Sequence, residues 1–276
     1  MIEISPQIEN EFGAARCFMF YDFDAAFSSS FLDMSESVFV EFGAQPTFAI
    51  GVFEEKKSKG DYRRVRKRIG DLLDSSGVDV KPVVRIDSTL SDEEEIIFPC
   101  DVRIAFSETS YGLKIGVVTV KERLVDSLEE FTNRVANLVF EQIGEAYAHA
   151  FNFPAVYGPD YYLGSIGVVP SGGSILENQS YRDRITRFRD HTWHRGLRPS
   201  QGYLREVYSI NFLLRSHLQR EFNGRAFSDY AEEVGDLLRI PNAKEFYRWE
   251  IAESELPSVR RDLEKSGLVL SAKILD

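Results

Sequence analysis

The stretch VRIAFSETSYGLKIGVVTV, residues 102–120, contains two apolar runs on either side of a short turn. Residues 102–106 and 113–120 are rich in β-branched and apolar side chains, which favour strands. Ser110, Tyr111 and Gly112 lie between the runs, and glycine adopts the backbone conformations that a tight turn requires. The stretch therefore predicts an antiparallel β-hairpin.

A long amphipathic helix is predicted directly after this hairpin, at residues 124–148. Its apolar side chains recur every three or four residues, at Leu128, Phe131, Val135, Leu138, Val139 and Ile143. Charged side chains such as Glu129, Arg134 and Glu141 fall on the other side of the helix. We therefore expect the apolar stripe to be buried against a sheet.

Strand and helix patterns are interleaved along the rest of the chain. Strands are predicted at residues 15–24, 47–53, 78–86 and 246–251, and helices at residues 31–42, 61–77, 179–193, 207–222, 227–238 and 255–266. This order favours an α+β fold, with a mixed, largely antiparallel sheet packed by helices and a more helical C-terminal part. We expect an α+β lobe at residues 1–170 and a helix-rich lobe at residues 171–276, packed as one unit.

Composition narrows the class of protein. The chain has 44 acidic and 33 basic residues and a net charge of −11, whereas nucleic-acid binders are usually basic. Cys17 and Cys100 lie far apart in apolar surroundings, which indicates buried thiols in a reducing compartment. The first ten residues lack the pattern of a signal peptide, and no run of about 20 apolar residues could span a membrane. We expect a cytoplasmic protein without a membrane partner.

No complete catalytic motif is present, so the chain is interpreted as a protein without catalytic residues or a cofactor. Two pairs of residues resemble parts of a metal site. His191 and His194 are three residues apart, as two ligands on a helix can be, but no third ligand stands at a diagnostic spacing. Asp22 and Asp24 follow the first strand and could bind Mg²⁺, but no second acidic motif accompanies them. Neither pair is assigned to a metal.

Arginines are concentrated in one stretch of the C-terminal half. They are Arg182, Arg184, Arg187, Arg189, Arg195, Arg198 and Arg205, with Trp193 among them. Arginines beside an aromatic residue could bind nucleic acid, as part of a bacterial defence system. The preferred interpretation is internal pairing, because Asp183, Asp190 and Glu206 are interspersed. A second basic stretch covers residues 56–68.

Two segments resemble a known family when they are taken together. They are IGEAYAHAFNFP at residues 143–154 and EVYSINFLLRSHLQREFNGRAF at residues 206–227. The pattern resembles the type VI secretion immunity-like family of bacterial proteins. The resemblance implies a cytosolic α+β protein that neutralises a toxin by covering its active site, and it implies no catalytic residues. The leading hypothesis is therefore a non-enzymatic, protein-binding immunity protein.

Two segments are the predicted contact surface for the cognate protein, which on this hypothesis is a toxin. One is the acidic run Asp92, Glu93, Glu94 and Glu95, which would attract a basic partner. The other contains Tyr157, Asp160, Tyr161 and Tyr162, in a region rich in glycine and proline. Tyrosine combines a large contact area with a polar tip, so this segment could also form a homodimer.

Overall fold

The computed structural model describes residues 14–23, 29–53, 56–75, 82–88, 100–109, 111–154 and 179–272. Its main feature is a ten-stranded sheet in which neighbouring strands are antiparallel. In spatial order the strands are β11 (Asp236–Arg239), β12 (Phe246–Glu250), β8 (Ile210–Leu214), β7 (Tyr147–Pro154), β1 (Ala14–Tyr21), β6 (Lys114–Lys121), β5 (Val102–Glu108), β4 (Pro82–Asp87), β2 (Phe48–Phe53) and β3 (Lys56–Asp61). The predicted α+β class is confirmed.

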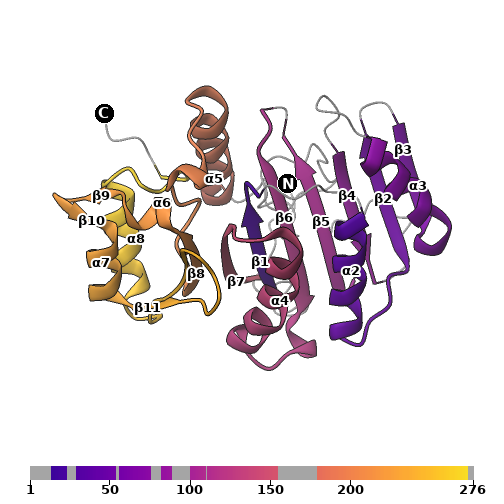
Figure 1. Cartoon of the computed structure of the whole chain (residues 1–276), viewed down its shortest axis with the longest axis horizontal. Coiled ribbons are helices and arrows are strands. Elements are labelled where there is room, and N and C mark those ends of the chain that lie inside the picture. Colours follow the sequence, from indigo (N-terminus) through magenta and orange to yellow (C-terminus); the bar gives the residue numbers. More distant parts are fainter. Residues whose placement is uncertain are drawn as a thin grey trace.

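Helices cover both faces of the sheet, but over different strands (Figure 1). One face carries α2 (Ser29–Glu41), α3 (Tyr62–Ser75) and α4 (Leu128–Ile143). The other face carries α5 (Gln179–Arg189), α7 (Phe227–Val234) and α8 (Leu256–Lys265). A short α6 (Arg215–Leu218) precedes a small hairpin of β9 (Glu221–Phe222) and β10 (Arg225–Ala226). None of the helices in the described part of the chain has the length and apolar character needed to cross a bilayer.

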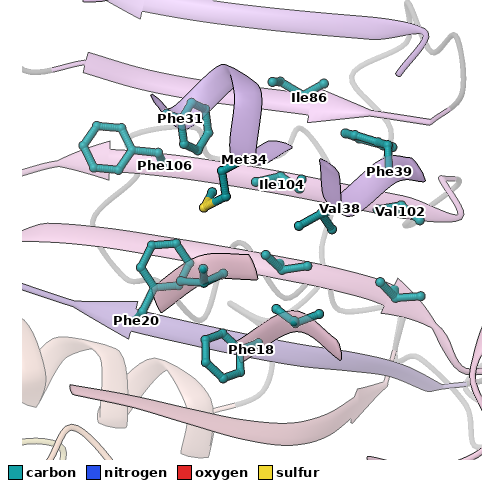
Figure 2. Packing of buried hydrophobic residues seen from close by; sticks show 14 of the residues in the cluster. Phe18, Phe20, Phe31, Met34, Val38, Phe39, Ile86, Val102, Ile104 and Phe106 are labelled. Carbon is teal, nitrogen blue, oxygen red and sulfur yellow. The ribbon is translucent and has the colours of Figure 1, made fainter. Parts of the chain in front are cut away.

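The central strand β1 feeds two separate cores, because successive side chains of a strand point to opposite faces. Phe18 and Phe20 belong to the core under α2, α3 and α4. Met19 and Tyr21 belong to the core under α5, α7 and α8. Figure 2 shows Phe18 and Phe20 beside the α2 side chains, including Met34, in the first of these cores.

The predicted hairpin and the long helix are both present. Strands β5 and β6 pair from Glu108 opposite Lys114 to Val102 opposite Val120. Helix α4 begins after Ser127, whose hydroxyl accepts a hydrogen bond from the backbone N–H of Glu130. It ends earlier than predicted, because Gly144 has a φ of 75° and residues 147–154 form strand β7. Its predicted stripe is buried at Phe131, Val135 and Val139 and partly buried at Leu128 and Leu138.

Two predicted helices are each replaced in part by a strand. Residues 210–214 form β8 between β7 and β12, where Phe212 belongs to one core and Leu213 to the other. Residues 236–239 form β11 after α7 has ended at Val234. Gly235 permits this change of direction, since a Cβ there would lie 2.3 Å from the backbone oxygen of Glu250. Pairing with neighbouring strands overrides the local helical pattern in both places.

Candidate functional site

Several strands start or finish at the same end of the sheet, which we call the Pro154 end. Strand β7 finishes there at Pro154, paired with Ala14 at the start of β1. Strand β5 starts there at Val102, and β4 finishes at Asp87, one strand further along the sheet. Strands β7 and β4 are four strand spacings apart, which corresponds to about 19 Å.

The two predicted contact segments are attached to this end. Asp92, Glu93, Glu94 and Glu95 lie outside the described residues, as do Tyr157, Asp160, Tyr161 and Tyr162. The described residues that flank the acidic run are Ser88, which follows β4, and Cys100, which precedes β5. The tyrosine segment follows Pro154, the last residue of β7. Both segments therefore start from the same end of the sheet.

A cavity of about 370 Å³ lies near the Pro154 end of β7. Its lining combines aromatic and aliphatic side chains with charged ones. The apolar lining residues are Phe151, Phe153, Tyr208, Leu256 and Leu128, and the charged ones are Arg184, Glu206, Glu253 and Arg260. Charged and aromatic side chains that converge on one cavity can hold a ligand.

The cavity lies beyond the point where β8 stops pairing with β7. Strand β8 pairs with β7 only from Ala148 to Ala150, so that within the described residues no strand pairs with this edge of β7 at residues 151–153. A turn directs the chain away, in which Asn211 accepts a hydrogen bond from the backbone N–H of Tyr208 and donates one to its carbonyl. The Tyr208 ring then stacks on Phe151, with ring centroids 4.4 Å apart.

One wall of the cavity is a network of charged residues around Glu206, which is only 3% exposed. Arg184 donates through Nη1 to both carboxylate oxygens of Glu206 at 2.6 Å, and through Nη2 to Glu264 at 3.0 Å. The Ser271 hydroxyl also donates to Glu206. Because Arg184 lies on α5 and Glu264 on α8, the network ties both helices to the segment that contains Glu206.

Arg260 and His149 both lie close to the Tyr208 ring. The Arg260 Nε donates to the Val207 carbonyl at 2.7 Å, and its guanidinium lies 5.1 Å from the Tyr208 ring centroid. The His149 ring is fully buried, 4.8 Å from the Tyr208 ring. Burial, with smaller contributions from the charges of Arg205 and Arg260, lowers the pKa of His149 well below its ordinary value. His149 is therefore neutral at physiological pH.

Tyr147 reinforces the same wall from β7. Its hydroxyl donates to the Glu206 carbonyl at 2.9 Å and accepts a hydrogen bond from the backbone N–H of Arg205 at 3.0 Å. Burial raises the pKa of Tyr147, so the hydroxyl keeps its proton. His149 and Tyr147 are both fully buried behind this wall, where they support the segment that contains Glu206 and Tyr208.

Most described arginines of the predicted cluster are engaged within the molecule. Besides Arg184, Arg187 forms an ion pair with Asp183 at 3.5 Å. Arg205 is fully buried, with its guanidinium 4.3 Å from the Phe188 ring centroid. The Arg182 side chain lies outside the described residues.

Arg198 links the arginine stretch to the end of β1. It forms an ion pair with Asp22 at 3.7 Å and donates to the Tyr111 carbonyl. Ser200 also donates a hydrogen bond to Asp22. The Asp22 carboxylate is therefore engaged in internal contacts, and Asp24 lies outside the described residues.

An exposed aromatic stack lies at the opposite end of the sheet from Pro154. Residues Asp190–His194 form a π-helical turn that presents Trp193, which is 54% exposed. Trp193 is parallel to the His194 ring within 2° and stacks on Tyr111 of the β5–β6 turn at 6.1 Å. Arg189 and Arg195 are exposed on either side in sequence. These residues, with Trp193, are the part of the predicted cluster that a large ligand could contact.

The two histidines of the candidate metal pair have different surroundings. His191 is buried, and its Nδ1 lies 2.7 Å from the Leu270 carbonyl and 2.9 Å from the Arg187 carbonyl, so it serves as a hydrogen-bond donor. His194 is exposed and stacks on Trp193. Across the described ranges, no group of three or more His, Cys, Asp or Glu side chains could hold a metal ion.

The cavity could not have been found from the sequence. Its lining comes from the start of α4, from β7, from α5, from the segment before β8 and from α8 and the residues just before it, which are separated by up to about 130 residues of chain. Glu206 was identified only as a countercharge for arginine, and Arg260 and Asn152 were not identified. One signal was available: Asn152 lies between Phe151 and Phe153, and a polar side chain inside an apolar run indicates a strand position that faces solvent.

Comparison with known proteins adds one finding. No protein-family model matches the chain, and no curated protein matches it. Among solved structures, it is similar to the Pseudomonas aeruginosa T6SS protein PA0821, with a TM-score of 0.54 and 10% sequence identity over 93% of this chain and 73% of that chain. At this level of identity, what the two proteins share is a fold.

Proposed function

We propose that this chain is a non-enzymatic protein-binding module, and specifically a cytosolic immunity protein that neutralises a secreted toxin. The observation that carries the proposal is the Pro154 end of the sheet. A cavity with charged and aromatic walls lies at the same end from which the acidic run and the tyrosine segment start. The fold shared with a T6SS protein supports a role connected with type VI secretion.

The cavity offers two kinds of contact to a partner. Phe151, Phe153 and Tyr208 offer aromatic surface. Arg260 and Glu253 provide charges of opposite sign, which fix the orientation of a polar side chain. Such a site suits a protruding loop or strand of another protein.

The attached segments extend this site. Tyr157, Tyr161 and Tyr162 supply rigid contact area at low cost in side-chain entropy. The acidic run at residues 92–95 adds four negative charges, which speed association with a basic toxin. A standard protein interface buries about 800 Å² on each partner, enough to include both segments and the cavity.

Co-expression with the product of the neighbouring gene tests this function. We expect the chain to rescue cells from that product and to co-purify with it. Replacing Tyr161 and Tyr162 by alanine should weaken binding about 30-fold or more if they are interface anchors, since such residues contribute about 2 kcal/mol or more. Trp193→Ala is the matched control, because it removes an exposed aromatic residue at the opposite end of the sheet.

Three outcomes would contradict the proposal. If the chain neither rescues cells from the neighbouring gene's product nor co-purifies with it, the immunity role is ruled out. Normal binding by the tyrosine double variant, with loss of binding by Trp193→Ala, would place the interface at the wrong end. A homodimer in light scattering that is abolished by the tyrosine changes would assign the segment to self-association instead.

A further inference from the structure

A second surface of the molecule is strongly basic, although the whole chain has a net charge of −11. Residues 56–68 contain eight lysines and arginines and one acidic residue, Asp61. They form the edge strand β3 and the first half of α3, at one extreme of the long axis of the molecule (Figure 1). We call this surface the basic edge. Its exposed cations are Lys56, Lys57, Lys59, Arg63, Arg64, Lys67 and Arg68.

Most cations of the basic edge form no ion pair with a carboxylate in the described part of the chain. Arg66 forms ion pairs with Asp33 and Glu36 of α2. Six other cations form no ion pair with any carboxylate in the part of the chain that the structure describes: Lys56, Lys57, Arg63, Arg64, Lys67 and Arg68. In the arginine stretch of the C-terminal half, by contrast, Arg184 and Arg187 are ion-paired.

Folding alone does not account for this concentration of charge. Helix α3 packs through Tyr62, Ile69 and Leu73, which are buried, and its opposite side carries the cations. Arg63 and Lys67 are four residues apart, as are Arg64 and Arg68, and like charges at this spacing destabilise a helix by a few tenths of a kcal/mol per pair. Lysines on an edge strand prevent aggregation, which explains those of β3 but not the cations of α3.

We infer that the basic edge binds the phosphate backbone of nucleic acid without reading its sequence. Protein interfaces are depleted of lysine and use aromatic anchors, whereas phosphate contacts need only lysine and arginine. The only aromatic residue of the stretch, Tyr62, is buried and donates its hydroxyl to Glu36 at 2.7 Å. The helix also keeps its apolar side in the protein core, so it has none to insert into a lipid surface.

This activity is separate from the proposed immunity function, because it uses a different surface. Strand β3 is separated from β7 by five other strands of the sheet. Failure of one proposal therefore leaves the other standing. Of the two basic stretches in the sequence, the inference thus assigns nucleic-acid contact to residues 56–68 and not to the arginine stretch of the C-terminal half.

Fluorescence anisotropy with a labelled DNA duplex of arbitrary sequence tests the inference on the full chain. We expect binding at low salt that weakens steeply as salt is added. If all six unpaired cations contact phosphates, log K should fall against log[salt] with a slope of about −5. Replacing Arg63, Arg64, Lys67 and Arg68 by glutamine should reduce the steepness of that slope by about 3 to 4, because four contacts are lost.

The matched control removes exposed arginines elsewhere, as Arg189→Gln with Arg195→Gln, and should bind DNA like the wild type. Because all the changed side chains are exposed, thermal unfolding should show every variant folded. Three results would overturn the inference: no anisotropy change for the wild type at about 50 mM salt, unchanged binding by the α3 variant, or binding only to polyglutamate or to anionic lipid vesicles.

Discussion

Replacing Glu206 by glutamine tests whether the charged wall of the cavity is structural. The carboxylate is 3% exposed and accepts hydrogen bonds from Arg184 and Ser271, with Arg205 3.5 Å away. Glutamine keeps the shape but turns one acceptor into a donor that faces these donors, and it removes the countercharge of two arginines. Removing one partner of a buried ion pair costs about 3–5 kcal/mol. Because Arg184 is 28% exposed, we expect the lower limit, about 3 kcal/mol.

Equilibrium urea unfolding followed by circular dichroism measures this change, and the melting temperature should fall by about 6 °C or more. Glu264→Gln is the matched control, since Glu264 also pairs with Arg184 but is 33% exposed and should contribute less than about 1 kcal/mol. A Glu206→Gln protein as stable as the wild type, or more stable, would refute the reasoning. It would mean that the carboxylate is held for a ligand at a cost to the folded state.

Three further predictions concern the interior and the helix ends. Burial lowers the pKa of His149 and brings that of His217 to about 4, so each histidine binds a proton in the unfolded chain below about pH 6.5 but not in the folded one. The free energy of unfolding should therefore fall as the pH drops from about 6 to 5, by about 1.4 kcal/mol per pH unit for each histidine. His149→Gln should halve this slope when urea unfolding is measured across that pH range. Gly116→Ala places a Cβ 2.1 Å from the Phe20 ring and should cost about 3 kcal/mol, with Phe20→Leu restoring part of the loss in thermal unfolding. Ser127→Ala removes the cap of α4 and should cost about 1 kcal/mol, measured by denaturant midpoint; no shift would mean that water replaces the cap.

Local patterns predicted those elements whose partners lie nearby in the chain. The hairpin at residues 102–120 was predicted because both strands and their turn are contiguous in sequence. Helix α4 was predicted because its apolar spacing matches the helical repeat, and Gly144 explains why it stops five residues earlier than the pattern suggested. Strand β3, at residues 56–61, was not predicted, since its lysines have low strand propensity and β2 pairing holds it in place.

The secondary structure of residues 207–222 depends on their tertiary contacts. Their apolar spacing is compatible with a helix, but Ile210 and Phe212 fill one core, Leu213 fills the other, and the backbone pairs with β7 and β12. A segment buried on both faces satisfies its backbone hydrogen bonds best as a central strand. That outcome depends on neighbours about 60 residues before and 36 residues after it.

Charge shows the same division between sequence and tertiary structure. The sequence by itself determined that arginines are concentrated in two stretches and that the chain as a whole is acidic. Only the fold decided which arginines are neutralised: Glu206 and Glu264 converge on Arg184, whereas the carboxylates of α2 reach Arg66 but not Arg63 or Lys67. An ion pair requires its two charged groups within about 4 Å, and the chain brings distant residues that close only when its strands have paired and its cores have packed.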